Sequence, residues 1–230
     1  MNEFRPAINT QQNRIKFQER KYQVTTIKSK RKAKKSKDIK YGTTANFDGV
    51  LLPIQNREDW GSYRPILKAT HDQLKNMLSH HCKILALRVD FHVNRDHWKE
   101  GDFSKLLKNS KRKICNHYKL KRIAHIWARE ASSNGSHHYH LVLIIDANKV
   151  NNPMVITNTL TQEWIKMGHP HPRRNNHHIL NNTVDNHFLD AFHHFSYLAK
   201  IHTKDLQPAN ARNVGSSNVK LNNKRLARVA

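Results

Sequence analysis

Residues 84–93 read Ile-Leu-Ala-Leu-Arg-Val-Asp-Phe-His-Val, and this stretch decides the fold class of the chain. Large apolar residues occupy every second position from Leu85 to Val93. Because successive side chains of a β-strand point to opposite faces of the sheet, these residues share one face. The stretch therefore predicts a strand with one buried face and one polar face, and the polar face carries Ala86, Arg88, Asp90 and His92.

The sequence on both sides of this strand alternates between helical and strand patterns. Apolar residues recur at helical spacing at about 64–79, 103–118, 155–167 and 187–204. Strand patterns occur at about 122–130 and 137–146, joined by a turn that contains Asn134-Gly135, and a short strand is allowed around Ile179. This order predicts an α+β fold, an antiparallel sheet with helices mainly on one face.

The two ends of the chain differ from the middle in composition. Residues 28–37 read KSKRKAKKSK, a basic block that should repel itself and stay disordered without a partner. We therefore expect a basic arm at 1–45, one domain at 46–206 and a basic, flexible tail at 207–230. The arm is either a DNA-tracking segment or a solubilising tail.

The charge of the chain indicates a polyanionic partner. Lys and Arg number 41 against 17 Asp and Glu, which gives a formal net charge of +24. A protein this basic binds nucleic acid by counterion release, either as an enzyme or as a protein that only coats its partner. The sequence has no apolar run of transmembrane length and no signal peptide, and its two cysteines form no C-x-x-C pair. These features predict a protein of the reducing cytoplasm with no membrane partner.

Three residues in the second and third strands have the chemistry of a metal site. His138 and His140 flank Tyr139, so both imidazoles lie on one face of the third strand. Hairpin pairing should bring Glu130, at the end of the second strand, next to them. Two imidazoles and one carboxylate can hold a divalent ion and leave coordination positions open. With 18 histidines in the chain, an H-x-H pattern can also arise by chance.

The last helix carries a candidate nucleophile. Tyr197 and Lys200 are three positions apart and so lie on one side of a helix. A tyrosine oxygen can attack phosphorus, and a nearby lysine can stabilise the charge that develops. On a helical wheel, however, Tyr197 falls nearly opposite the apolar stripe Phe188, Phe192, Phe195 and Ala199. It reaches a metal site on the sheet only if that stripe packs elsewhere or the helix is distorted near Tyr197.

The order Glu130, His138-x-His140 and Tyr197-x-x-Lys200 resembles the HUH endonuclease superfamily, whose core is a ferredoxin-like or RRM-like sheet. It is most similar to the single-tyrosine replication initiators of filamentous phages (inoviruses) and rolling-circle plasmids, including the YagK/YfjJ-type prophage family. The similarity covers about 83–203 and includes the segments Arg88-Val-Asp90 and Arg129-Glu130. Single-tyrosine transposases share this motif order and remain an alternative, as does a non-catalytic DNA-binding protein.

The resemblance implies a DNA nickase that starts rolling-circle replication. Glu130, His138 and His140 would hold Mg²⁺ or Mn²⁺, and Tyr197 would attack single-stranded or extruded origin DNA with help from Lys200. The products would be a 5′-phosphotyrosine and a free 3′-hydroxyl that a host polymerase extends. Because the chain has no P-loop motif, a host helicase would separate the strands. Candidates for DNA contacts are Arg88, Asp90, Arg129 and Lys204.

Overall fold

The computed structural model describes residues 38–56, 60–131, 136–150, 152–181, 183, 185–201 and 213–223. Most of the expected basic arm, the hairpin turn at 132–135 and Lys204 lie outside these residues. In the described part of the chain, no helix has the length and apolar character needed to cross a membrane.

A five-stranded antiparallel sheet forms the middle layer of the molecule, in the order β8-β5-β7-β6-β9. The α+β class with an antiparallel sheet is therefore confirmed. Its strands are β5 (Ile84–His92), β6 (Ala124–Ala131), β7 (His137–Asp146), β8 (Arg173–Leu180) and β9 (Val214–Ser216). Strand β8 is longer than the short strand expected around Ile179 and begins within the proline-containing loop.

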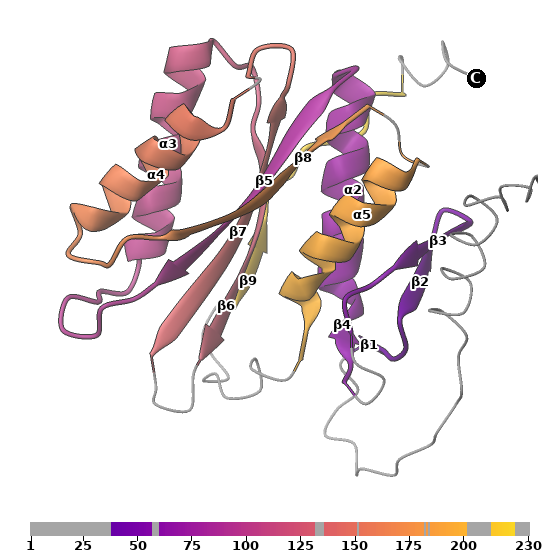
Figure 1. Ribbon diagram of the computed structural model, residues 1–230, viewed down its shortest axis with the longest axis horizontal. Coiled ribbons are helices and arrows are strands. Elements are labelled where there is room, and N and C mark those ends of the chain that lie inside the picture. Colours follow the sequence, from indigo (N-terminus) through magenta and orange to yellow (C-terminus); the bar gives the residue numbers. More distant parts are fainter. Residues whose placement is uncertain are drawn as a thin grey trace, which may run out of the picture.

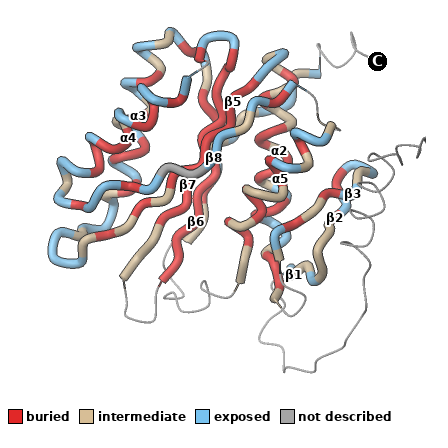
Figure 2. Tube along the Cα trace, in the orientation of Figure 1, coloured by how far each residue is buried: buried red, intermediate tan, exposed pale blue. Residues whose placement is uncertain are grey.

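Helices cover both faces of this sheet, so the expectation of helices mainly on one face is wrong (Figure 1). Helices α2 (Arg64–His80) and α5 (Asn186–Ser196) pack on one face, and α3 (Asp102–Tyr118) and α4 (Met154–Ile165) pack on the other. The physical reason is that the supposed polar face is polar only at one end. At the other end it carries apolar residues, and Figure 2 shows the central strands buried along most of their length.

Each face of the sheet has its own hydrophobic core. Phe91, Leu141 and Leu143 pack with Phe103 of α3 and Trp164 of α4. On the opposite face, apolar residues of β5, β6 and β7 pack against α2 and against the aromatic stripe of α5; they include Ile84, Ala86, Ile126, Val142, Ile144, Leu67, Leu74, Phe188, Phe192 and Phe195. Burying such side chains contributes roughly 1.5–3 kcal/mol each, which fixes α5 against the sheet.

Four short strands precede α2, and the sequence did not predict them. They form two small antiparallel pairs, β1 (Ile39–Lys40) with β4 (Ser62–Tyr63) and β2 (Thr44–Phe47) with β3 (Val50–Pro53). Strand β3 packs on α5, on the side away from the large sheet (Figure 1). The part of the expected arm from residue 38 onward therefore belongs to the folded domain.

The ordered core also extends past residue 206, into the segment expected to be a flexible tail. Strand β9 pairs with β6 and forms one edge of the sheet. Gly215 in β9 lies so close to the indole of Trp127 that a Cβ atom there would collide with the ring. This close approach requires glycine and holds the C-terminal segment against the domain.

Candidate active site

The polar ends of three neighbouring strands meet at one end of the sheet, beneath α5. Glu130 at the end of β6 lies opposite His138 at the start of β7, as the hairpin predicted. In β5, which pairs with the other side of β7, Asp90 lies opposite His140 and His92 lies opposite His138. The antiparallel register thus gathers side chains from three strands on one face.

His140 is the centre of this group. Its Nδ1 lies 2.8 Å from Oδ1 of Asp90, and its Nε2 lies 3.3 Å from Oε2 of Glu130. Burial alone would lower the pKa of His140, but the two carboxylates raise it above its ordinary value. The imidazole is therefore held between two acidic groups, and only 6% of the residue is exposed.

Arg88 and Asp90 form a second part of the site. The Nε and one terminal nitrogen of Arg88 donate to the two oxygens of Asp90, each at 3.0 Å. Burial by itself would raise the pKa of Asp90, but hydrogen bonds from His140 and Arg88 hold it well below the usual range. Asp90 thus stays ionised and orients both side chains, while Arg88, which is 6% exposed, lies inside the site.

His138 is turned toward β5. Its Nε2 lies 3.0 Å from Nδ1 of His92, and the two rings meet edge to face with 4.1 Å between centroids. Among the described residues, no three His, Cys, Asp or Glu side chains converge as a metal-binding group. Glu130 and His140 are in contact. His138 lies on the same face of the sheet, but its imidazole is directed toward His92 and not toward these two residues.

The donor atoms of this group nevertheless fit a divalent cation. Nε2 of His140 is buried and forms no hydrogen bond among the described residues, although Oε2 of Glu130 lies 3.3 Å away. Two atoms that both bind Mg²⁺ at about 2.1 Å and at right angles lie roughly 3 Å apart, close to the separation observed here. Because Nδ1 is engaged by Asp90, Nε2 is the ring nitrogen that would bind a metal, after losing its proton.

Tyr197 lies next to this group because α5 ends one residue before it. The phenylalanine stripe does pack on the sheet. Helix α5 stops at Ser196, however, and Tyr197–Ala199 form a 3₁₀ turn with a tighter winding, so the α-helical wheel does not extend to Tyr197. The ring of Tyr197 stands edge to face with that of His140, with 5.3 Å between centroids, and the guanidinium of Arg88 lies 4.4 Å from the Tyr197 ring centre.

The charges around Tyr197 act in opposite directions on its phenol. Burial and the nearby carboxylates of Glu130 and Asp90 raise the pKa of Tyr197, whereas Arg88 lowers it. Lys200 adds a second cation, with Nζ 5.1 Å from the centre of the Tyr197 ring. The site thus holds two cations against the aromatic face of the candidate nucleophile.

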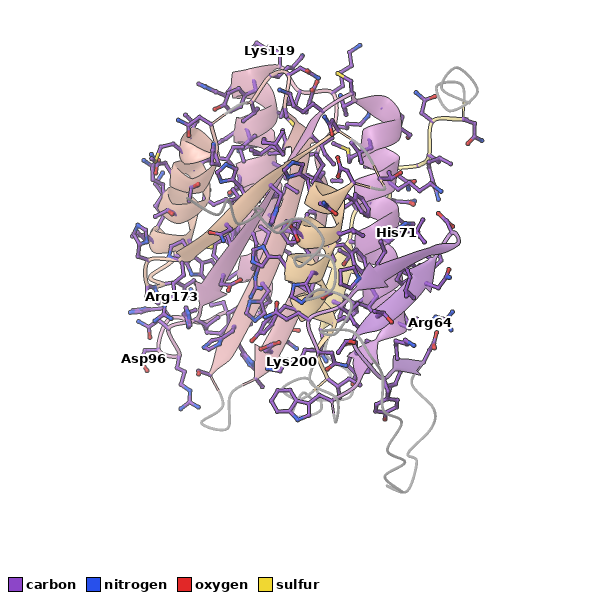
Figure 3. The ribbon with its side chains drawn as sticks, turned by 45° about the vertical axis from the view of Figure 1, so that its right-hand side comes forward. Arg64, His71, Asp96, Lys119, Arg173 and Lys200 are labelled. Carbon is purple, nitrogen blue, oxygen red and sulfur yellow. The ribbon has the colours of Figure 1, made fainter. Side chains whose placement is uncertain are left out.

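A pocket of about 250 Å³ opens beside Tyr197, lined by Gln55, Asn56, Trp60, Tyr197 and Lys200. Nζ of Lys200 lies 4.7 Å from the Trp60 ring centre, so the ammonium lies near both rings. Backbone contacts hold the segment around Trp60 against the turn that contains Tyr197. The N–H of Ile201 donates to the carbonyl of Gly61 at 3.1 Å, and Ser62 forms an isolated antiparallel β-bridge with Lys200. Figure 3 shows Lys200 at the lower end of the molecule, where the polar strand ends lie.

The remaining predicted DNA contact within the described chain lies elsewhere. Arg129 is on the opposite face of the sheet from Glu130, is 8% exposed, and donates to the side-chain oxygen of Asn213 at 3.0 Å. The structure therefore brings together Glu130, His138, His140, Arg88, Asp90, Tyr197 and Lys200, and leaves Arg129 out.

Sequence reasoning missed two contributors to this site. His92 shares the polar face of β5, but its contact with His138 depends on β5 pairing with β7, which no local pattern reveals. Trp60 lies far from Tyr197 in the chain and in a segment without a periodic pattern, so no sequence signal pointed to it.

Most of the folded domain and the whole candidate active site lie within a match to a known protein family. The family model named YagK/YfjJ C-terminal domain matches residues 50–217, a range that runs from β3 to β9 and includes every residue brought together above. No curated protein and no solved structure matches the chain.

Proposed function

Because the chain belongs to the YagK/YfjJ C-terminal domain family, we propose that it is a metal-dependent DNA nickase of the HUH type that initiates rolling-circle replication. The observation that carries the proposal is the position of Tyr197. Its ring lies against His140 and Arg88, although the residue is distant from both in the sequence. A tyrosine placed between an imidazole–carboxylate group and two cations has the surroundings of a nucleophile that attacks phosphate.

Glu130, His138 and His140 are the residues that would hold a divalent cation. Bound Mg²⁺ or Mn²⁺ would polarise the scissile phosphate and offset the Glu130 charge that raises the pKa of Tyr197. Asp90 fixes the ring of His140 through Nδ1 and thereby presents Nε2 to the site. His138 lies on the same face as the other two and would have to turn away from His92 to join them.

The proposed reaction is a transesterification. The Tyr197 oxygen forms a bond to phosphorus while the bond from phosphorus to O3′ of the preceding nucleotide breaks. The phenolic proton passes through water to the departing O3′, which leaves as a free hydroxyl. The energy of the broken bond is kept in the 5′-phosphotyrosine, so attack by a 3′-hydroxyl can rejoin the strand without ATP.

Arg88 and Lys200 stabilise negative charge in this scheme. Both are cations at the ring of Tyr197, where they stabilise a phenolate or the negative charge on the attacked phosphate. Arg88 is too deeply buried to track the DNA backbone, so its role is confined to the reacting group. Lys200 borders the pocket beside Tyr197 and can reach a phosphate there.

The substrate in this proposal is single-stranded or extruded DNA. The pocket beside Tyr197 offers the indole of Trp60 for base stacking and the amides of Gln55 and Asn56 for hydrogen bonds. Oδ1 of Asn56 is buried and has no hydrogen-bond partner among the described residues, which leaves an acceptor for an amino group of a base. Stacking on aromatic side chains is the usual way to bind an unpaired nucleotide.

A non-catalytic DNA-binding protein is the second candidate. It is favoured by the absence of a converged three-residue metal group among the described residues, since His140 could serve only as a partner in an ion-pair network. This reading predicts DNA binding that is independent of metal and of Tyr197.

A nicking assay separates the two candidates. The full chain is incubated with Mn²⁺ and a supercoiled plasmid that carries the origin of its own genetic element. We expect open-circular product and protein covalently attached to DNA, both lost in Tyr197→Phe and in His138→Ala. Tyr118→Phe, at the end of α3 on the other face of the sheet, is the matched control and should nick normally. Equal activity of Tyr197→Phe and the wild type would exclude the nickase.

A further inference from the structure

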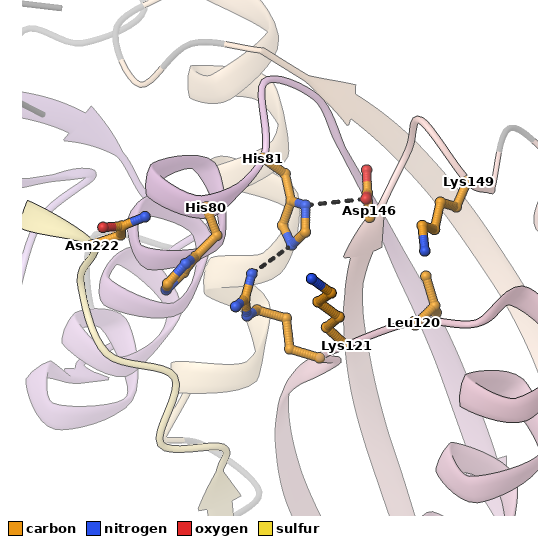
Figure 4. Close-up of a pocket in the computed structure, with 8 residues that line it drawn as sticks. His80, His81, Leu120, Lys121, Asp146, Lys149 and Asn222 are labelled. Carbon is orange, nitrogen blue, oxygen red and sulfur yellow. Dashed lines mark hydrogen bonds and ion pairs between the residues drawn. The ribbon is translucent and has the colours of Figure 1, made fainter. Parts of the chain in front are cut away.

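A second pocket, of about 450 Å³, is shown in Figure 4. Its residue Asp146 ends β7, whereas the candidate active site lies at the start of that strand. His80 and His81 border it at the end of α2, Lys121 and Arg122 lie before β6, and Asp146 and Lys149 lie at and just after the end of β7. Strand β7 connects the two ends of the sheet, and the six steps along the strand from His140 to Asp146 span about 20 Å. In Figure 3, Lys119 marks this end of the molecule and Lys200 the other.

Three cationic side chains and one carboxylate, Asp146, line the pocket, so its formal charge is positive. Lys121, Arg122 and Lys149 come from two separate segments, and within the described chain none of the three forms an ion pair. The carboxylate of Asp146 contacts Asn148 and His81. One of its oxygens accepts hydrogen bonds from the backbone and side-chain nitrogens of Asn148, at 3.0 and 2.9 Å. Its other oxygen lies 3.1 Å from His81 Nδ1.

His81 places Arg122 at the pocket. Because Nδ1 of His81 donates to Asp146, its Nε2 is an acceptor, and it lies 3.3 Å from a terminal nitrogen of Arg122 (Figure 4). Burial lowers the pKa of His81, so the neutral ring that this arrangement needs is the favoured form. One N–H of Arg122 is used in this contact, and a guanidinium has five in a fixed planar fork.

The second cation is also held in position. Nζ of Lys149 donates to the carbonyl of Lys119 at 2.6 Å, which ties the ammonium to the end of α3. An ammonium has three donors, so two remain for a ligand. Arg122 and Lys149 thus line one pocket, each held by a contact with a neutral group and each with donors left over.

We propose that this pocket binds a phosphate group of the DNA backbone and gives the protein a second DNA contact remote from Tyr197. An arginine fork beside a lysine is the arrangement that recognises phosphate, and the pocket is large enough for the attached sugar. A free nucleotide offers the same phosphate chemistry, and the experiment below includes it as a separate ligand. The proposed site does not depend on metal or on strand cleavage.

Cys82 provides a local reporter for the test. It is exposed, it directly follows His81, and its sulfur lies 3.6 Å from the side-chain oxygen of Asn148. Cys115 is a free thiol on α3 whose pKa burial raises, so it serves as an internal reference. The rate at which iodoacetamide alkylates each cysteine of the full chain is followed by peptide mass spectrometry, without metal, in the presence of duplex DNA, of dTMP or of inorganic phosphate.

We expect duplex DNA to slow the alkylation of Cys82 several-fold and to leave Cys115 unchanged. Arg122→Ala/Lys149→Ala should lose this protection, and its plot of log affinity for DNA against log salt should be less steep by about 2, one for each lost phosphate contact. The matched control, Lys105→Ala/Lys108→Ala, removes the same charge from the exposed side of α3 and should keep the protection.

Three results would overturn the proposal. They are protection of Cys82 that persists in Arg122→Ala/Lys149→Ala, no protection by DNA in the wild type, and protection by dTMP but not by DNA. Lys149→Glu, a single change at an exposed side chain, repeats the test in a variant whose folding is not in question. None of these outcomes depends on Tyr197, so failure here is distinct from failure of the proposed nickase.

Discussion

The rings of Tyr197 and His140 meet edge to face with 5.3 Å between their centroids, although the two residues belong to different elements on the chain. This contact exists because α5 stops at Ser196 and the next three residues wind as a 3₁₀ turn. A continuous α-helix would have carried the tyrosine to the side opposite the buried phenylalanines. The contact joins the candidate nucleophile to the group of side chains that we propose as the metal site.

Asp90 should control metal affinity without being a metal ligand. It lies 2.8 Å from Nδ1 of His140, and its ionised form fixes the ring that presents Nε2. We expect Asp90→Asn to weaken Mn²⁺ binding by about 10–100-fold, as loss of such a supporting contact usually does. Isothermal titration of the DNA-free protein measures this. Asp72→Asn, which removes an exposed carboxylate paired with Lys68, should bind Mn²⁺ like the wild type, and unchanged affinity in Asp90→Asn would contradict the assigned role.

Trp60 should be the main base-stacking residue. The indoles of Trp127 and Trp164 are 8% and 0% exposed, so Trp60 and Trp98 are the partly accessible ones. Binding of a single-stranded oligonucleotide should quench tryptophan fluorescence in the wild type and in Trp98→Phe, and much less in Trp60→Phe. Trp60→Ala should weaken binding by about 1–3 kcal/mol. Equal quenching in the two phenylalanine variants would rule out stacking at Trp60.

The large elements of the fold were predictable because each carries its own pattern. The alternation at 84–93 and the helical spacing at about 64–79 are local, and the structure has β5 at Ile84–His92 and α2 at Arg64–His80. The face of the sheet that each helix covers could not be predicted from local patterns. Ala86 and Ile84 look unremarkable in sequence, but together with Val142 and Ile144 they make half of the second face apolar, and α2 and α5 bury it.

The packing of β9 against the sheet leads to a prediction about the free energy of unfolding. Gly215 approaches the Trp127 ring so closely that a side chain cannot be placed without moving the indole or detaching the strand. We expect Gly215→Val to destabilise the protein by about 1–3 kcal/mol, in the range of overpacking changes. Urea unfolding of the full chain measures the loss. The control is Ser216→Val, because Ser216 is an exposed position in the same strand, and this variant should unfold like the wild type. A glycine such as Gly49 is a poorer control, because its positive φ would strain any side chain placed there. An unchanged Gly215→Val would mean that β9 is not docked.

Acidic pH should destabilise the domain in part through His194. Burial first, and then the charge of Arg88, lower the pKa of His194 from 6.5 to about 4, and its Nδ1 lies 3.1 Å from Nε2 of His178. Since the unfolded chain binds this proton more readily, stability should fall as the pH drops from about 6.5 to about 4. His194→Gln, which cannot titrate, should show a flatter dependence of unfolding free energy on pH over that window. Parallel curves for the two proteins would contradict the assignment.

Local sequence patterns account for only part of the candidate site, for a physical reason. Glu130, His138 and His140 lie on strands joined by a short turn, so local pairing predicts their proximity. Tyr197, Trp60 and His92 reach the site through contacts between distant segments, and the decisive one is the place where α5 ends. A helix end with no glycine or proline, such as Ser196-Tyr197, has no strong sequence signal.

The most direct test of the central claim is to identify the residue that becomes bonded to DNA. The full chain is incubated with Mn²⁺ and a single-stranded oligonucleotide from its origin, digested with protease and nuclease, and analysed by mass spectrometry. The proposed nickase predicts a nucleotide attached through its 5′-phosphate to the peptide that contains Tyr197. An adduct on another residue, or cleavage of the oligonucleotide without any adduct, would show that Tyr197 is not the nucleophile.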